Sequence, residues 1–252
     1  MIEGNFAISE NREIAPGMMK MVLEGSVPEE TKPGQFVNIL LPERFLRRPI
    51  SISDVIPGAD GRLALIYKVV GKGTEDMAGM KEGTCLDLLL PLGNGYDLNA
   101  PMGDNLLLVG GGSGIPPLYL LAKKLLSMGK RVTVVMGFNK KEEIYYQEEF
   151  SALGCRVVVT TVDGSYGTKG FVTDGIKDAG DSYTYYFACG PEPMLKALYQ
   201  SLDFHGQMSF EERMGCGFGA CMGCSIKLKN ETKRICKDGP VFKKEEIIPW
   251  TD

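Results

Sequence analysis

The chain has 252 residues, of which 44% are apolar and 24% are charged, and its formal net charge is −4. This composition is that of an ordinary globular protein, and it excludes wholesale disorder and a fibrous fold. The acidic balance argues against a general nucleic-acid binder, which needs a basic face for phosphates. The length leaves room for two domains and a small third one.

No targeting or membrane segment is predicted from the sequence. The first residues, MIEGNFAISENREI, are acidic and lack the apolar core of a signal peptide. The longest uncharged stretch, residues 106–122, contains four glycines and two prolines and is too short to cross a bilayer. We therefore expect a cytoplasmic protein with reduced thiols, no membrane contact and no nucleic-acid partner.

Residues 1–100 are predicted to form an antiparallel β-barrel. Short apolar runs recur between turn sequences such as Lys32-Pro33-Gly34, a spacing typical of barrels and sandwiches. One helical turn is expected at residues 74–80. The predicted strands of this region cover residues 18–23, 35–41, 49–53, 63–70 and 84–90.

Residues 101–208 alternate between strand and helix patterns, which predicts a doubly wound parallel sheet. The first strand, residues 105–109, runs into the glycine-rich sequence 110–114 and then into a helix over residues 116–128. The later predicted elements are strands at residues 131–136, 155–161 and 183–188, and helices at residues 141–153, 173–179 and 191–204.

Residues 209–252 show no long periodic run, and roughly 45 residues bury too little apolar surface to fold alone. A metal centre is expected to hold this segment together. The predicted fold class is therefore α+β and multidomain. An antiparallel barrel (1–100), a doubly wound parallel α/β domain (101–208) and a small C-terminal [2Fe–2S] module (209–252) follow one another.

The cysteine spacing carries the metal prediction. Cys216, Cys221, Cys224 and Cys236 follow the pattern C-x4-C-x2-C-x11-C, whose first intervals match the plant-type [2Fe–2S] ligand run. Glycines between them let the backbone come close to anionic sulfides. The alternatives are zinc, disulfides and unligated core thiols, although structural zinc sites more often present two C-x2-C pairs.

Two glycine-containing sequences in the α/β region point to a nucleotide. Glycines 110, 111, 112 and 114 follow a buried strand and precede a helix, where backbone N–H groups can approach a pyrophosphate. The sequence is not a strict G-x-G-x-x-G, and a tight structural connection is the alternative. Cys189-Gly190-Pro191 joins another strand to a helix. Cys189 is expected either beside a nicotinamide or as a small buried residue.

The barrel region holds a second pair of such features. Arg48-Pro49-Ile50-Ser51 lies on a predicted strand, and Gly71-Lys72-Gly73-Thr74 opens the short helix in an anion-binding arrangement. The alternative for the arginine is an exposed charged edge. Two phosphate sites in two domains indicate two dinucleotides.

Together these motifs resemble the ferredoxin–NADP reductase superfamily. Arg48 to Ser51 fall on its flavin motif, Gly71 to Thr74 on its flavin-phosphate loop, and both sequences of the α/β region on its pyridine-nucleotide motifs. The cysteine module from Glu211 onward is similar to that of the electron transfer subunits of NAD-dependent dihydroorotate dehydrogenases of type B. Ile50 departs from the superfamily pattern, because many members carry an aromatic residue there.

The resemblance implies FAD, a [2Fe–2S] cluster and NAD(H) as cofactors. FAD would be held by Arg48, Pro49, Ile50, Ser51, Leu65, Ile66, Tyr67, Gly73 and Thr74. NAD(H) would be held by Gly110, Gly111, Gly112, Gly114, Cys189, Gly190 and Pro191, and the cluster by Cys216, Cys221, Cys224 and Cys236. Lys140 and Lys141 follow a predicted strand where a 2′-phosphate would bind, but the resemblance favours NAD over NADP.

The implied function is that of an oxidoreductase component without a catalytic side chain. It would pass electrons between the FMN of a dihydroorotate dehydrogenase catalytic subunit and NAD in pyrimidine (orotate, UMP) biosynthesis, in a hetero-oligomer with two copies of each chain. The first alternative is the flavin and [2Fe–2S] subunit of a sulfhydrogenase or of an NADH-dependent ferredoxin:NADP oxidoreductase (a transhydrogenase). Others are a redox-sensing interaction protein and a zinc-stabilised binding module.

Overall fold

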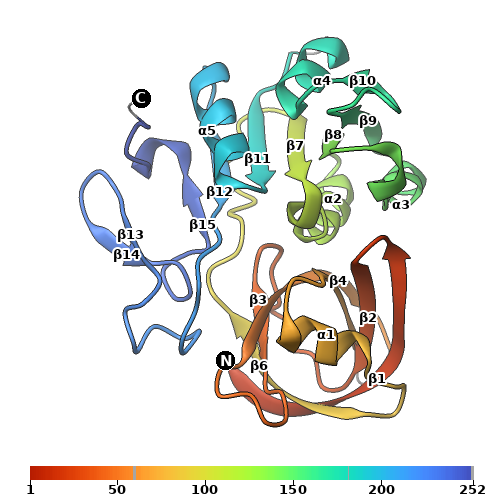
Figure 1. Ribbon diagram of the computed structural model, residues 1–252. Helices are drawn as coiled ribbons and strands as arrows, with labels where there is room; N and C mark the ends of the chain where they lie inside the picture. The colour runs from red at the N-terminus through yellow and green to blue at the C-terminus, as the bar shows by residue number, and fades with distance from the viewer. Residues whose placement is uncertain (59–60, 181, 251–252) are drawn as a thin grey trace. The chain divides into compact units, whose positions relative to one another are not determined.

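The computed structural model describes residues 1–58, 61–180 and 182–250 (Figure 1). Three domains, 1–100, 101–208 and 209–252, remain the sequence-based prediction, whereas the structure forms two compact units. No helix among the described residues is long and apolar enough to span a membrane. The first unit comprises Met1–Gly95, Glu211–Ile226 and Lys233–Pro240, and the second comprises Tyr96–Phe210, Lys227–Thr232 and the chain from Val241.

The first unit is built on a closed antiparallel barrel of six strands, in the order β1-β2-β5-β4-β3-β6. Helix α1 (Lys72–Ala78) lies in the connection between β5 and β6. The strand β1 was not predicted, because its many polar residues give no continuous apolar run. The strands are β1 (Ile2–Ala15), β2 (Met18–Glu24), β3 (Phe36–Ile39), β4 (Arg48–Ile56), β5 (Arg62–Lys68) and β6 (Cys85–Leu92).

Buried and exposed side chains alternate along the barrel strands, and the buried ones fill the interior of the barrel. In β6, every second residue is buried, since successive side chains of a strand point to opposite faces. These leucines (86, 88, 90 and 92) are at most 4% exposed. Burying each one contributes about 1.5–3 kcal/mol, so the pattern fixes which face of the strand points inward.

The second unit contains a seven-stranded sheet in the order β10-β9-β8-β7-β11-β12-β15, parallel except for its last strand (Figure 1). Helices connect the parallel strands except β9 and β10, which a turn joins, and the predicted fold class is confirmed. The strands are β7 (Asn105–Gly111), β8 (Arg131–Phe138), β9 (Arg156–Thr161), β10 (Thr168–Lys169), β11 (Tyr185–Cys189), β12 (Gly206–Ser209) and β15 (Val241–Lys243). The helices are α2 (Pro117–Ser127), α3 (Gln147–Ala152), α4 (Val172–Ala179) and α5 (Glu192–Ser201).

One helix prediction is wrong. The range 141–153 holds a 3₁₀ turn, Lys141–Glu143, and then α3, which begins only after Tyr146. Tyr146 adopts a left-handed conformation with φ of 64°, which breaks a helix. It is buried and packs edge-to-face on Tyr119 and Phe150, so aromatic packing overrides the local helical pattern.

The C-terminal segment contains three short strands. Strands β13 (Ser225–Lys227) and β14 (Thr232–Arg234) form a two-stranded sheet. Strand β15 pairs antiparallel with β12, with Met208 opposite Phe242, and extends the sheet of the second unit. Strands of three or four residues show too little periodicity to be predicted.

Candidate cofactor sites

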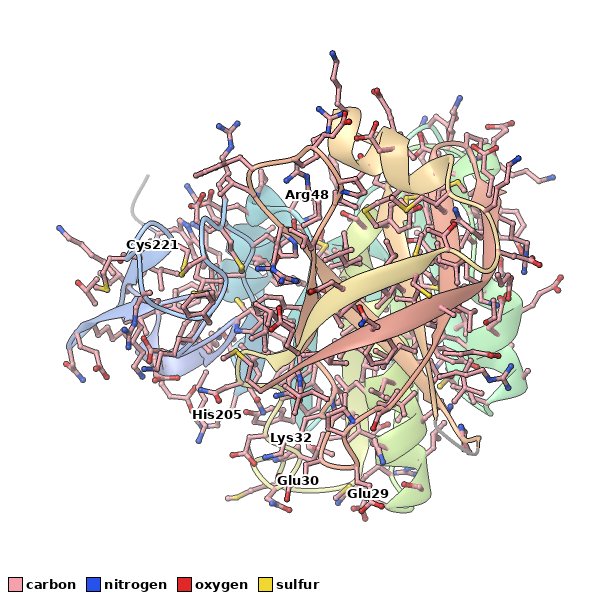
Figure 2. The ribbon with its side chains drawn as sticks, turned by 90° about the horizontal axis from the view of Figure 1, so that it is seen from below. Glu29, Glu30, Lys32, Arg48, His205 and Cys221 are labelled. Atoms are coloured by element: carbon pink, nitrogen blue, oxygen red, sulfur yellow. The ribbon has the colours of Figure 1, made fainter. Side chains whose placement is uncertain are left out.

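The four predicted cluster ligands lie in the two C-terminal segments of the first unit. Cys216, Cys221 and Cys224 lie on the irregular chain before β13, and Cys236 follows β14. Figure 2 shows Cys221 on a loop rather than on a helix or strand, and its side chain is exposed. Cys224 and Cys236 are only 2% and 1% exposed. None of these four cysteines is joined in a disulfide, which disfavours the disulfide alternative.

Backbone N–H groups point at two of these sulfurs. The amides of Ala220 and Cys221 lie 3.2 and 3.5 Å from Cys216 Sγ, and the amide of Cys236 lies 3.4 Å from Cys224 Sγ. Burial raises the pKa of Cys216, but amides of the loop, that of Cys221 first, outweigh it and lower the pKa to about 6. The loop therefore stabilises an anionic sulfur, the form that binds metal.

The cysteines lie close enough to interact, Cys216 with Cys221, and Cys236 with both Cys224 and Cys216. Burial, followed by the neighbouring Cys224 and Cys216, raises the pKa of Cys236 to about 12. Among the described residues, no three His, Cys, Asp or Glu side chains gather where one ion would hold them. The spacing of the four cysteines matches the plant-type [2Fe–2S] ligand run, and this favours two irons over a zinc ion.

Gly219 and Arg234 shape this loop, and of the two only Arg234 was missed by the sequence analysis. Gly219 has a φ of +92°, and a Cβ there would lie 2.5 Å from Lys237. Arg234 donates from Nη1 to the carbonyl of Gly219 at 2.9 Å and forms an ion pair with Asp238 at 3.0 Å. Arg234 therefore connects the loop of Cys221 with the segment that follows Cys236. Arg234 lies among other basic residues such as Lys233 and Lys237, so no sequence pattern singles it out.

In the barrel, Arg48 lies against the first turn of α1. A Cβ at Gly73 would clash with the Arg48 guanidinium, so only glycine permits this approach. The Thr74 hydroxyl donates to the carbonyl of Gly71 at 2.9 Å and accepts from the amide of Val70 at 2.9 Å. Thr74 thus closes the turn, while the guanidinium and the start of α1 form a place suited to phosphate. Figure 2 marks Arg48.

The other predicted flavin residues differ in accessibility. Pro49, Ile50 and Ser51 on β4 are half-buried and keep part of their surface open. On β5, the residues at positions 65–67 are at most 4% exposed. The Tyr67 hydroxyl donates to Asn11 Oδ1 at 3.4 Å, and burial raises its pKa. The assignment of Leu65, Ile66 and Tyr67 to a flavin site therefore stays a prediction from resemblance.

The nucleotide motifs meet at one edge of the parallel sheet. Gly110 lies opposite Cys189 in the β7–β11 ladder, so both strands end together. A Cβ at Gly114 would clash with the carbonyl of Cys189, and one at Gly111 would lie 2.7 Å from Met194 Sδ. The loop that follows β7 and the loop that follows β11 therefore contact each other where glycines leave the backbone without side chains. Ligands of open α/β sheets bind at this edge, beyond the carboxyl ends of the strands.

The other residues predicted to bind NAD(H) also lie at this edge of the parallel sheet. Gly112 has a φ of +50° with open space around it, and Gly190 approaches the Met194 side chain. Pro191 precedes α5 as its N-cap. Cys189 is 2% exposed, which agrees with the alternative of a small buried residue. The assignment of these residues to NAD(H) stays a prediction.

Tyr145 is a contact that the sequence analysis did not find. Its hydroxyl donates to the carbonyl of Gly112 at 2.7 Å, and its ring packs edge-to-face on Phe138. Burial raises the pKa of this phenol, so it stays a donor. The contact fixes the glycine-rich loop from a side chain placed after β8. Lys140 and Lys141, which also follow β8, are exposed.

Comparison with known proteins agrees with this division of sites. The model of the iron-sulfur cluster binding domain of dihydroorotate dehydrogenase B matches residues 211–248, and that of the oxidoreductase NAD-binding domain matches residues 108–200. A protein of Fusobacterium nucleatum named dihydroorotate dehydrogenase B (NAD(+)), electron transfer subunit, is 45% identical, covering 95% of this chain and 96% of its own. This chain belongs to that family. A protein of the same name from Geobacillus sp. (strain WCH70) is 44% identical over 98% of this chain and 99% of its own.

Solved structures agree with this family assignment. The NADH-dependent reduced ferredoxin-NADP oxidoreductase structure is 33% identical with a TM-score of 0.87, covering 97% of this chain and 90% of that chain. A ferredoxin NADP+ reductase from Neisseria gonorrhoeae, solved with FAD and NADP, shares the fold at 22% identity, with a TM-score of 0.67 and coverage of 79% and 89%. The predictions of an oxidoreductase component, its cofactor set and electron transfer are confirmed at the level of the family.

Proposed function

We propose that this chain passes electrons between NAD(H) and a catalytic dihydroorotate dehydrogenase subunit. The observation that carries the proposal is the set of backbone amides aimed at Cys216 Sγ and Cys224 Sγ, on segments that belong to the same compact unit as the Arg48 site. FAD, when bound, exchanges the two electrons of a hydride carrier for the single electrons that an iron–sulfur cluster accepts. The chain's own residues bind, orient and shield these groups.

Each cofactor would be held by groups that the structure brings together. The Arg48 guanidinium and the turn closed by Thr74 would bind the FAD pyrophosphate, with β4 residues 49–51 beside the flavin. The four thiols would hold the [2Fe–2S] cluster, with loop amides donating to its sulfur. The bare backbone at Gly110–Gly114 would receive the NAD pyrophosphate.

The exposure of the cysteines indicates where electrons leave the chain. Cys224 and Cys236 are buried, whereas Cys221 is exposed and its neighbours Phe218 and Met222 are 44% and 53% exposed. An exposed ligand flanked by apolar side chains suits contact with a protein partner. We propose that the FMN-containing catalytic subunit docks there, in a cytoplasmic hetero-oligomer with two copies of each chain that serves pyrimidine biosynthesis.

Reconstitution with the catalytic subunit tests this function. The chain and its catalytic partner, mixed with dihydroorotate and NAD⁺ under anaerobic conditions, are expected to form NADH, followed at its absorbance band. The catalytic subunit alone is expected to reduce artificial acceptors but not NAD⁺. Absence of NADH formation by a complex that contains FAD and iron would contradict the proposal.

The structural relative at 33% identity supports a second candidate. An NADH-dependent ferredoxin-NADP oxidoreductase uses a chain of nearly the same fold and length. The curated relatives at 44% and 45% identity favour the dihydroorotate partner. Copurification from the native cell separates the two, because each candidate requires a different partner chain.

A further inference from the structure

Two asparagine side chains of the barrel unit hold the backbone of the cysteine-bearing segments. Asn38 Nδ2 donates to the carbonyl of Cys216 at 3.1 Å. Asn94 Nδ2 donates to the carbonyls of Lys237 and Asp238, each at 3.2 Å. One asparagine therefore holds the segment that begins the ligand run, and the other holds the segment that follows Cys236. All of these residues belong to the same compact unit.

Asn38 lies on β3, directly opposite Pro49 of the predicted flavin motif on β4. It is 1% exposed, and a Cβ at the neighbouring Gly217 would clash with its amide nitrogen. The reverse orientation of the amide would put its oxygen against the Cys216 carbonyl, so the donor must face the loop. One buried side chain therefore joins the strand of the flavin motif to the first cluster ligand.

The arrangement is unfavourable for Asn38 taken by itself. Its Oδ1 is buried and has no hydrogen-bond partner among the described residues. A buried acceptor without a partner destabilises the fold, and an apolar side chain of the same size would avoid that cost. Asn38 is therefore explained by what its donor does for the loop rather than by barrel stability.

Backbone contacts reinforce the connection that Asn94 makes. The amide of Asn94 donates to the carbonyl of Gly239 at 2.6 Å, and Asn94 forms a β-bridge with Pro240. A Cβ at Gly93 would lie 2.8 Å from the same Gly239 carbonyl. The chain that follows Cys236 therefore packs directly against the residues at the end of β6.

We propose that Asn38 and Asn94 are positioning residues that fix both ligand segments on the barrel and so set the separation between the cluster and the flavin. The inference rests on the proposed function, since it requires both groups to bind. The loop of residues 210–224 has no helix or strand of its own, so its position depends on such contacts. Electron transfer slows steeply as the separation of two centres grows.

The experiment compares the full-length wild-type chain with Asn38→Leu, Asn94→Ala and the double variant. Asn105→Ala is the matched control, because Asn105 Nδ2 also donates to a distant carbonyl, that of Ser182, but in the other unit. Iron and sulfide content, the EPR spectrum of the reduced cluster, and the stopped-flow rates of flavin and cluster reduction by NADH are measured. Hydrogen exchange of the loop amides gives a readout that needs no turnover.

We expect Asn38→Leu to lower the rate of cluster reduction by about 10–100-fold, as loss of outer partners of metal ligands does. The EPR spectrum should change, loop exchange should rise, and flavin reduction should fall far less than cluster reduction. Asn94→Ala should shift the same readouts by less, and the double variant by most. Asn105→Ala should match the wild type.

Two kinds of failure are distinguishable. If both single variants match the wild type in EPR, loop exchange and cluster reduction, the positioning role is overturned. If the wild type itself binds neither flavin nor iron, the proposed function fails instead. Should Asn38→Leu not fold, Asn94→Ala decides the matter, because Asn94 is exposed and its removal leaves the barrel core intact.

Discussion

The nucleotide edge and the cysteine loop are built in opposite ways. At the edge, parallel strands end in register, and glycines keep the backbone bare, so the site follows from sheet geometry. The cysteine loop has no regular structure, and individual side chains such as Asn38 and Arg234 hold its carbonyls. Regular structure therefore positions the proposed nucleotide site, whereas specific side-chain contacts position the proposed metal site.

The largest effect expected is the loss of the cluster in Cys221→Ser. The variant removes one predicted cluster ligand with an exposed side chain, so the iron–sulfur EPR signal should vanish, while FAD and its reduction by NADH remain. Cys85→Ser is the matched control, because Cys85 is also exposed but lies on β6 outside the loop. Loss of the flavin together with the cluster would show that the two sites are not separable.

Arg48→Gln should weaken FAD binding by about 10–100-fold, because a hydrogen bond from a charged group is worth about 1.5–3 kcal/mol. Arg47→Gln is the control. Arg47 forms ion pairs with Asp87 and Glu3 on the barrel, so its loss should lower stability slightly and leave FAD affinity unchanged. Equilibrium dialysis of FAD measures both variants, and equal losses would contradict the assignment of Arg48.

Gly114→Ala tests the bare backbone of the nucleotide edge. The new Cβ would press on the Cys189 carbonyl, and overpacking of this kind typically costs about 1–3 kcal/mol. We expect a lower unfolding midpoint in denaturant and weaker NADH binding. Gly79→Ala, just after α1, is the control, because its φ of −81° suits any residue and a Cβ there would meet only atoms 3.6 Å or more away, so it should lose less in stability. Equal stability losses would show that contact between the two loops is not the constraint.

Tyr145→Phe should have the smallest effect. It removes one hydrogen bond, to the carbonyl of Gly112, and leaves the ring packing in place. A neutral hydrogen bond contributes about 0.5–1.5 kcal/mol, so we expect NADH affinity to fall by roughly 2–10-fold. Fluorescence titration with NADH measures the change, and unchanged affinity would place the contact outside the nucleotide site.

The same contrast explains what the sequence could predict. The glycine-rich turn, the parallel alternation and the cysteine spacing are local patterns, and they indicated the fold class, a nucleotide site and an iron–sulfur centre. The full cofactor set followed from the resemblance to a known superfamily. Strand register then brought Gly110 and Cys189 together as the topology requires. The assignments of single residues to FAD, NAD(H) and the cluster stay predictions.

Contacts between distant parts of the chain were not predictable. Nothing near Asn38 in the sequence indicates that its partner is Cys216, and Tyr145 appeared to lie in a helix that Tyr146 in fact breaks. The short strand β15 likewise exists through its pairing with β12 rather than through its own pattern. Such features depend on tertiary packing, which no local propensity records.

The most direct test is an anaerobic titration of the purified full-length chain with NADH, followed by visible absorption and EPR. The account predicts that the flavin absorbance bleaches and that the EPR signal of a reduced [2Fe–2S] centre then appears, with the signal missing from Cys221→Ser. A chain that binds zinc instead of iron, or a cluster that stays oxidised while the flavin is fully reduced, would contradict it.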